Sequence, residues 1–316
     1  MTPGAFLLRL RQRTQGGPKT TWYREVVRAR ILKAAPLLGT SDSTLCEVHL
    51  LTSKEDWLNA CWAILSFYRA SGVNYALTIH EDGTLPEFAH QTLSRLFPDA
   101  RIIRRSEADA QVRASLANFP RSLAFHESNK LSLKVFDVLH YTRAPRVMLL
   151  DSDILFFSHP TELIRRIEDP SFAWNSANED VASAYTVDAE TVSQHCGLTL
   201  VDRFNSGLCI FHRESLRLDW FEEFLGIPGA VGHFWRIEQT LLALASSRFG
   251  CRLLPDEYKV RVEPGIAGRP VKHYVGAIRD LMYREGLASL DASGLLTSTR
   301  SSRPQAMSAE AVRSEH

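Results

Sequence analysis

The sequence has no long hydrophobic run and few cysteines. Its longest apolar stretches are pieces such as residues 147–150, whereas a membrane-spanning helix needs roughly 20 consecutive apolar residues. The first residues show no compact hydrophobic segment followed by a small-residue cleavage site, which a secretory signal would require. The 5 cysteines are odd in number and include no C-x-x-C pair, which argues against a disulfide framework and a zinc site. We therefore expect a cytoplasmic protein.

The chain as a whole also lacks an excess of charge of either sign. It has 37 Lys and Arg against 36 Asp and Glu, and 45% of its residues are hydrophobic. This composition is typical of globular proteins and excludes a fibrous or wholly disordered chain.

The positive charge is concentrated at the start of the chain. Residues 1–40 hold eight basic residues and one acidic residue, and no basic cluster recurs later. Aromatic and aliphatic residues alternate with these arginines at roughly helical spacing. The pattern favours a helix that packs its apolar stripe on the domain, with peripheral contact to the inner, anionic face of a membrane as the alternative. Nucleic acid is not expected as a partner.

Composition divides the chain into three segments. Residues 1–43 form a basic N-terminal arm that we expect to be partly helical. Residues 44–288 carry the regular patterns of an α/β domain. Residues 289–316 are rich in Ser, Ala and Arg without a sustained period, which predicts a flexible C-terminal tail.

Strand and helix patterns alternate through the first part of the domain. A helix is expected after the first strand, and Ser53 with Asp56 predicts a capping box at its start. Continuous apolar strands that alternate with helices predict a mostly parallel sheet covered on both faces. The predicted strands are 45–51, 75–79, 100–103 and 146–150, and the predicted later helices are 85–96 and 131–141.

Polar side chains follow two of these strands. Thr52 and Ser53 come after the first strand, and Asp151, Ser152 and Asp153 come after strand 146–150. Ligands of such sheets bind at the carboxyl ends of the strands. Two carboxylates one residue apart are costly to bury unless a bound cation compensates them, and oxygen ligands suit Mg²⁺ or Mn²⁺. By itself the D-x-D pattern is also compatible with a solvated turn.

Two further polar motifs precede apolar runs. Asn205, Ser206 and Gly207 follow Phe204 and run into a strand predicted at 208–211, where a glycine allows the backbone to approach a ligand. Glu238 opens the helical run 240–245 together with Gln239, so first-turn polar groups would point into a cleft. The structural alternatives are an ordinary turn and an ordinary helix start.

A last motif, His273-Tyr274-Val275-Gly276, precedes Arg279. Imidazole is a common ligand of divalent ions, although a lone histidine is usually structural. A guanidinium group could clamp phosphate oxygens through charge-assisted hydrogen bonds.

In this order, the motifs resemble those of the retaining glycosyltransferases of family eight, which include glycogenin and bacterial lipopolysaccharide galactosyl- and glucosyltransferases. The resemblance covers residues 45–287. The family's F-N-S-G segment is matched letter for letter, whereas Glu238 replaces the Asp of its D-Q pair and Arg279 replaces the Lys of its closing motif. Membership would imply a single GT-A type domain with helices on both faces of its sheet.

The resemblance also implies a reaction. The family transfers a hexosyl group from a nucleotide-diphosphate sugar, usually UDP-linked, to a glycan, lipid-linked or protein acceptor, with retention of anomeric configuration. By this likeness Asp151, Asp153 and His273 would hold Mn²⁺ or Mg²⁺. Glu238 and Gln239 would steady the reacting sugar, or Glu238 would bind it covalently. The implied donor-binding residues are Thr52, Ser53, Lys134 (or Lys130), Asp151, Ser152, Asn205, Ser206, Gly276 and Arg279.

Residues 178–197, a polar segment with His195, are our prediction for the acceptor rim. Three other functions fit parts of the pattern. A haloacid-type phosphatase is disfavoured because Leu155 stands where that motif has Thr or Val. A nucleotidyltransferase is disfavoured because residues 51–55 contain no glycine. The remaining alternative is a non-catalytic GT-A-like binding or scaffold protein at a membrane surface.

Overall fold

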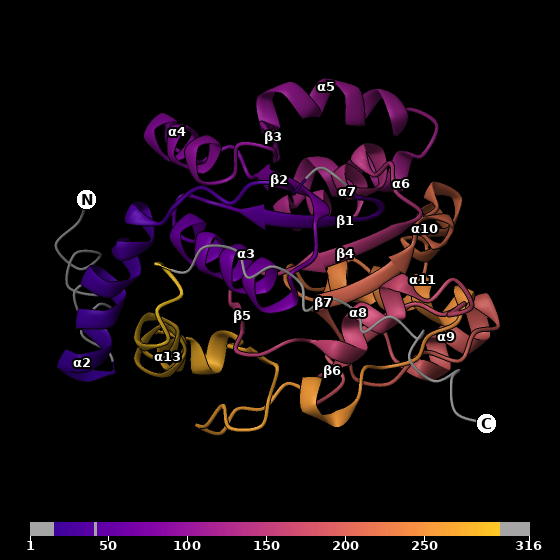
Figure 1. The fold of residues 1–316 in the computed structure, drawn as a ribbon. Coiled ribbons are helices and arrows are strands. Elements are labelled where there is room, and N and C mark those ends of the chain that lie inside the picture. Colours follow the sequence, from indigo (N-terminus) through magenta and orange to yellow (C-terminus); the bar gives the residue numbers. More distant parts are fainter. Residues whose placement is uncertain (1–15, 41–42, 298–316) are drawn as a thin grey trace, which may run out of the picture.

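The computed structural model describes residues 16–40 and 43–297 of the chain (Figure 1). Within these residues, the central element is a six-stranded sheet with the order β3-β2-β1-β4-β7-β6. The first four strands of this order pair in parallel, whereas β7 pairs antiparallel with both β4 and β6. The prediction of a mostly parallel α/β sheet is therefore confirmed. The strands are β1 (Ser43–Thr52), β2 (Tyr75–Glu81), β3 (Arg101–Ile103), β4 (Arg146–Leu150), β6 (Ser176–Glu179) and β7 (Phe204–His212).

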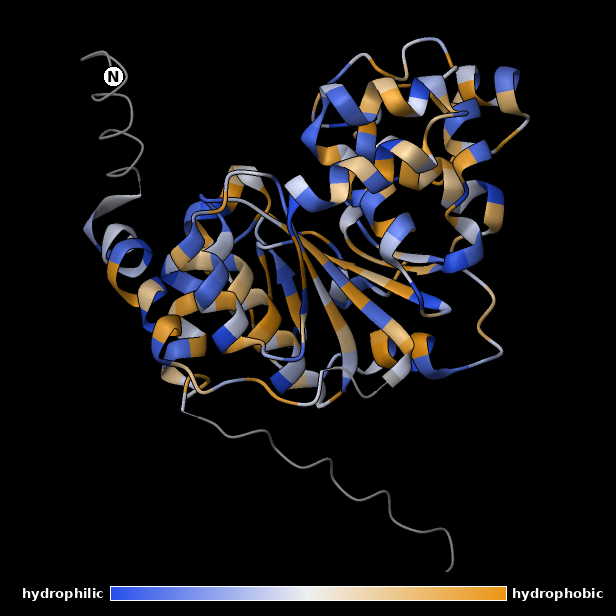
Figure 2. Ribbon diagram, turned by 90° about the horizontal axis from the view of Figure 1, so that it is seen from above, coloured by the Kyte–Doolittle hydropathy of each residue, from blue (hydrophilic) through white to orange (hydrophobic). Residues whose placement is uncertain are grey.

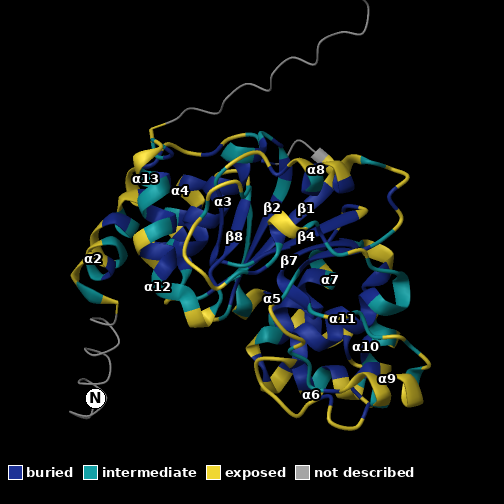
Figure 3. Cartoon of the chain, turned by 90° about the horizontal axis from the view of Figure 1, so that it is seen from below, coloured by how far each residue is buried: buried dark blue, intermediate teal, exposed yellow. Residues whose placement is uncertain are grey.

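Two apolar cores lie on opposite faces of this sheet (Figures 2 and 3). In β4, Met148 and Leu150 belong to one core, whereas Val147 and Leu149 belong to the other. This alternation explains why β4 is apolar from Val147 to Leu150, since both of its faces are covered. The α-helices are α2 (Gly17–Trp22), α3 (Trp57–Ser71), α4 (Glu87–Leu96), α5 (Arg105–Ser115), α6 (Pro120–Ser128), α7 (Phe136–Tyr141), α8 (Thr161–Glu168), α9 (Ala189–Cys196), α10 (Leu218–Phe224), α11 (Ile237–Phe249), α12 (Arg279–Leu281) and α13 (Ala288–Ala292).

A second, two-stranded sheet brings the end of the chain back to the centre. Strand β5 (Ile154–Phe156) pairs antiparallel with β8 (Val271–His273), and Ile154 lies opposite His273. Because Ile154 directly follows Asp153, this register fixes the imidazole beside the acidic pair.

Two local expectations were wrong. The predicted helix 131–141 is divided into a 3-10 turn, η3 (Lys130–Lys134), and α7, and the side chain of Asn129 accepts the N–H of Leu131 at the start of η3. The capping box of α3 is not formed. The N–H of Trp57 instead donates to the backbone carbonyl of Ser53. The Asp56 carboxylate pairs with Arg279, which explains why it does not cap the helix.

The N-terminal arm is helical from residue 17 to residue 33, where α2 continues into η1 (Tyr23–Val27) and η2 (Arg28–Lys33). Val27 and Ile31 are each 1% exposed and pack on the domain. The indole N–H of Trp62 donates to the carbonyl of Arg28, which ties the arm to α3. Residues 1–15 of the arm lie outside the described residues.

The C-terminal boundary differs from the predicted one. Leu290 and Leu295 are buried in the core, so the packed part of the chain extends past residue 289. Residues 298–316 of the expected tail lie outside the described residues. Among the helices that the structure describes, none combines the length and the apolar character that crossing a membrane requires.

One buried carboxyl group in α7 makes stability sensitive to pH. Asp137 is 1% exposed, and neither of its carboxyl oxygens has a hydrogen-bond partner among the described residues. The nearest basic group is the His126 ring, whose Nδ1 atom lies 4.0 Å from Oδ1. Burial, reinforced by the charge of Asp109, raises the pKa of Asp137 to about 7.

We predict that Asp137→Asn stabilises the fold more at pH 8 than at pH 5. A raised carboxyl pKa in the folded state means that wild-type stability is fully present below about pH 4, where the unfolded chain is also protonated, and declines as the pH rises through 7. The variant cannot ionise, so its gain in the free energy of unfolding grows with pH, toward a few kcal/mol. Urea titrations at the two pH values check this, and an equal gain at both would contradict it.

Candidate active site

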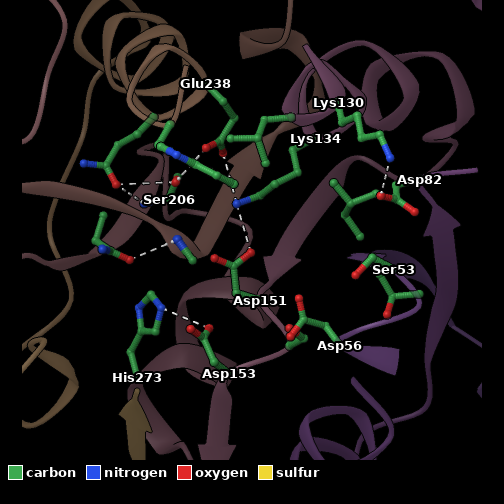
Figure 4. A pocket seen from close by; sticks show the side chains of 18 of the residues that line it. Ser53, Asp56, Asp82, Lys130, Lys134, Asp151, Asp153, Ser206, Glu238 and His273 are labelled. Atoms are coloured by element: carbon green, nitrogen blue, oxygen red, sulfur yellow. Dashed lines mark hydrogen bonds and ion pairs between the residues drawn. The ribbon is translucent and has the colours of Figure 1, made fainter. Parts of the chain in front are cut away.

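The carboxyl ends of β1, β2 and β4 open onto a cavity of about 460 Å³ (Figure 4). Its walls come from elements far apart in sequence, including η3, β7, α11 and β8. The lining residues are Leu51, Thr52, Ser53, Asp56, Asp82, Lys130, Leu131, Lys134, Asp151, Ser152, Asp153, Asn205, Ser206, Gly207, Phe234, Trp235, Glu238, Gln239, His273 and Arg279. Every predicted catalytic, donor-binding and metal-binding residue is among them except Gly276.

Asp151, Asp153 and His273 form one cluster in this cavity. Each offers a ligand atom, and these three atoms lie within 4.8 Å of one another. Asp153 and His273 are buried, whereas Asp151 is partly exposed to the cavity. Two carboxylate oxygens and one imidazole nitrogen make a donor set that suits a divalent cation.

Asp153 lies between two basic groups. Its Oδ1 atom is 3.2 Å from Nε2 of His273, and its Oδ2 atom is 2.6 Å from the guanidinium of Arg279. Burial alone would raise the pKa of Asp153, but these two neighbours outweigh it and hold the pKa below its usual range. Burial would lower the pKa of His273, and the charge of Asp153 outweighs it and raises that pKa. The other ring nitrogen of His273 is buried without a hydrogen-bond partner among the described residues.

Gly207 leaves room for this cluster, because any larger residue would collide with its side chains. A Cβ atom built at Gly207 would lie 2.3 Å from Cε1 of His273 and 3.0 Å from Oδ2 of Asp151. The F-N-S-G segment belongs to β7 itself, so we find strand where the sequence predicted a lead-in to a strand. The Gly207 carbonyl also accepts the N–H of Asp151 at 2.8 Å. The close approach of two side chains, and not a turn, explains this glycine.

Lys134 neutralises the acidic residues on the opposite wall. Its ammonium group is buried, 2.9 Å from Oδ1 of Asp151 and 3.1 Å from Oε1 of Glu238. Burial would lower the pKa of Lys134, but the two carboxylates outweigh this and raise it, so the side chain stays charged. The 3-10 turn η3 positions this lysine.

Glu238 and Gln239 lie in the first turn of α11, as the sequence predicted for a pair facing a cleft. The hydroxyl of Ser206 donates to Oε2 of Glu238 at 3.2 Å, and the N–H of Ser206 donates to Oε1 of Gln239 at 3.3 Å. Burial raises the pKa of Glu238, although Lys134 opposes the shift. Strand β7 and helix α11 are thus joined through their functional side chains.

At the end of β1, the side-chain hydroxyl of Thr52 is buried and unpaired among the described residues, and the residue as a whole is 2% exposed. Asp82 follows β2 and pairs with Lys130 at 2.9 Å. The sequence analysis did not predict that Asp82 or Asp56 would line the site. Asp82 follows a predicted strand, as Thr52 and Asp151 do. The same strand-end rule would have found it.

Two predicted regions do not reach the cavity. Gly276 begins η6 (Gly276–Ile278) outside the lining. Residues 178–197, the predicted acceptor rim, contribute none of the lining residues, and His195 is exposed on α9 with its ring bonded to the carbonyl of Thr191. Two aromatic residues missed by the sequence analysis, Phe234 and Trp235, line the cavity instead.

The sequence matches no family model and no curated protein. Solved structures do resemble the fold. The galactosyltransferase LgtC, in complex with donor and acceptor sugar analogues, superposes with a TM-score of 0.52 at 14% identity, over 80% of this chain and 97% of that one. The fold is the GT-A fold of glycosyltransferases.

Other structures with this fold are glycosyltransferases as well. An active-site variant of LgtC gives a TM-score of 0.52 at 15% identity, over 80% of this chain and 97% of that one. Mouse xyloside xylosyltransferase 1 gives 0.47 at 14% identity, over 73% of this chain and 98% of that one. The likeness to LgtC, at this low sequence identity, shows the GT-A fold and no shared substrate.

We predict that Gly207→Ala lowers the melting temperature and displaces His273. The added methyl group would overlap the ring, and overpacking of this kind typically costs 1–3 kcal/mol. Thermal unfolding and the NMR shift of the His273 ring measure both effects. Gly276→Ala is the matched control, because a Cβ atom there meets nothing within 4 Å. Equal melting temperatures for the two variants would contradict this account of Gly207.

Proposed function

We propose that the protein is a metal-dependent, retaining glycosyltransferase that uses a nucleotide-diphosphate sugar, UDP-linked by the resemblance to family eight. The observation that carries the proposal is the joint placement of an Asp-Asp-His cluster and two cations, Lys134 and Arg279, in the strand-end cavity of a GT-A fold. In such sheets this edge is where ligands bind.

The residues present fit a divalent cation. Oxygen and imidazole donors of three residues converge within 4.8 Å, and a buried ring nitrogen of His273 has no hydrogen-bond partner in the part of the chain that the structure describes. Asp151, Asp153 and His273 would hold Mn²⁺ or Mg²⁺. Such an ion supplies Lewis-acid stabilisation to the diphosphate leaving group.

The remaining polar residues would each bind a different part of the donor: the diphosphate, the nucleoside or the sugar. Lys134 and Arg279 provide positive charge for the diphosphate, through charge-assisted hydrogen bonds that strengthen as negative charge develops. Thr52 and Ser53, at the end of β1, face the base and ribose, and the free hydroxyl of Thr52 is one donor for them. The sugar group of the donor would be bound by Ser152, Asn205 and Ser206.

Retention of configuration has two routes, transfer on one face of the sugar or a covalent intermediate on Glu238. Both oxygens of Glu238 are engaged, one by Lys134 and the other by the hydroxyl of Ser206. A carboxylate held in this way is suited to stabilising positive charge on the sugar, and Gln239 beside it has the same role. We therefore favour transfer on one face, in which the departing phosphate takes the proton of the acceptor hydroxyl.

The non-catalytic alternative is not favoured. A module that only binds would not need both a complete set of ligands for a divalent ion and two basic residues, Lys134 and Arg279, that face the proposed diphosphate. The acceptor of the proposed enzyme is a hydroxyl of a glycan, a lipid-linked sugar or a protein.

We predict that the protein hydrolyses or transfers from UDP-hexoses only with Mn²⁺ or Mg²⁺, and that Asp153→Asn removes this activity. The loss should be about 100-fold or more, since even residues outside the ligand shell are worth 10- to 100-fold in metal affinity. Calorimetry with Mn²⁺ gives a readout that does not depend on turnover.

The control is Asp219→Asn, a surface carboxylate that pairs with Arg217 outside the cavity. It should bind Mn²⁺ and hydrolyse UDP-hexoses as the wild type does. Equal activity of Asp153→Asn with and without metal would refute the proposed function.

We also propose that the outer face of the N-terminal arm contacts an anionic membrane. Lys19, Trp22, Val26 and Lys33 recur at helical spacing and are exposed, with Trp22 53% and Val26 40% exposed. The opposite stripe of the arm is buried in the domain, so this face remains open. Lysines around an exposed indole ring are typical of helices that lie in the headgroup region.

We predict that the full chain sediments with phosphatidylglycerol vesicles and not with phosphatidylcholine vesicles, and that the double variant Lys19→Glu/Lys33→Glu reduces this binding. Each basic residue near an anionic surface is worth about 1 kcal/mol, and salt screens the attraction. Arg213→Glu, an exposed position on η4 (Arg213–Ser215) outside this face, should bind as the wild type does. Binding that is insensitive to both lysines would contradict the contact.

A further inference from the structure

Two exposed aromatic side chains stand at the mouth of the candidate active site. Phe234 is 46% exposed and Trp235 is 69% exposed, yet both line the cavity. Their rings meet edge to face, with centroids 4.9 Å apart. Large apolar rings that remain in water at the rim of a polar site indicate a binding surface.

The aromatic pair is fixed to both walls of the cavity. The backbone carbonyl of Phe234 accepts a hydrogen bond of 2.9 Å from the side chain of Asn129, the residue that caps η3. Lys134 lies on that same turn. On the other side, Trp235 precedes Glu238 by three residues and leads directly into α11. The backbone that carries the rings is therefore joined to the elements that carry Lys134 and Glu238, the two residues proposed to act on the donor.

The cavity changes character from its floor to its mouth. The floor carries the charged groups Asp151, Asp153, Lys134 and Arg279, which suit a diphosphate and a cation. Phe234 and Trp235 are exposed, as is Lys130, which pairs with Asp82, and all four of these residues line the same cavity. A second substrate that enters here meets an apolar face flanked by polar groups.

A pyranose ring matches this combination. One of its faces presents C–H groups, whose positively polarised hydrogens are attracted to the negative face of an aromatic ring. Its hydroxyls project from the edge, where polar groups can bind them. An alkyl chain would use the rings but not the neighbouring charges, and a charged peptide would use the charges but not the rings.

We propose that Phe234 and Trp235 form the acceptor subsite, and that the acceptor group seated there is a pyranose residue of a neutral glycan. This inference rests on the proposed function, since it assigns the second substrate of the same site. It places acceptor recognition on the segment before α11, in place of the rim predicted at 178–197.

Saturation-transfer NMR tests the subsite directly. The probes are lactose, cellobiose, maltose and octyl β-galactoside, each added to the full-length wild type, Trp235→Ala, Trp235→Tyr and Phe88→Ala. We expect transfer to the ring C–H protons of at least one probe, about tenfold weaker binding in Trp235→Ala, and substantial recovery in Trp235→Tyr, because tyrosine restores an aromatic face. Phe88→Ala, which changes an exposed aromatic ring on α4 outside the cavity, should bind as the wild type does.

The outcomes separate this inference from the proposed function. Sugar binding is measured without donor or metal, whereas the proposed function stands or falls on metal-dependent hydrolysis of UDP-hexoses. With an acceptor that binds, Trp235→Ala should lower kcat/KM for that acceptor at least tenfold more than it lowers donor hydrolysis. No transfer to any probe, transfer confined to the octyl chain, or equal binding by the wild type and Trp235→Ala would overturn the subsite.

Discussion

The candidate site depends on balancing three carboxylates that share one largely buried cavity. Asp151, Asp153 and Glu238 would repel one another at this depth, and buried charge persists only when it is paired and hydrogen-bonded. Lys134 forms ion pairs with Asp151 and Glu238 on one side of the cavity. His273 and Arg279 form ion pairs with Asp153 on the other side. This arrangement requires basic groups from three different elements, η3, β8 and α12, so the electrostatics of the site and the tertiary fold specify each other.

The sequence predicted the parts of this arrangement that have local signals. Strand β4 is apolar from Val147 to Leu150 because both faces are covered, and the D-x-D pair follows it without a break. The polar pair at the start of α11 and the F-N-S-G segment were likewise readable. These signals, and the resemblance that they carry, were enough to predict the fold class and most of the polar residues that line the cavity. Each of these residues lies where a strand or helix reaches the edge of the sheet that faces the cavity.

The features that were missed depend on contacts distant in sequence. The break between η3 and α7 lies within a continuous apolar stripe, so periodicity alone predicts one helix there. Its local sequence predicts that Asp56 caps a helix, but in the fold its carboxylate pairs with Arg279, which lies more than two hundred residues later in the chain. Trp235 has no periodic context, and its position at the cavity is fixed by the bond between Asn129 and Phe234, which joins segments over one hundred residues apart. Sequence patterns describe single elements, whereas these contacts join two.

The pairing of β5 with β8 has a consequence for how the chain matures. Ile154 and His273 are neighbours across a ladder, but 118 residues separate them along the chain. Closing so long a loop costs entropy that only tertiary packing can offset, and pairings of this range are slow to form. A nascent chain that has folded through β4 already displays both aspartates without the imidazole. The cluster of Asp151, Asp153 and His273 is thus completed late, and a product truncated before Val271 would contain all six strands of the central sheet while lacking the imidazole.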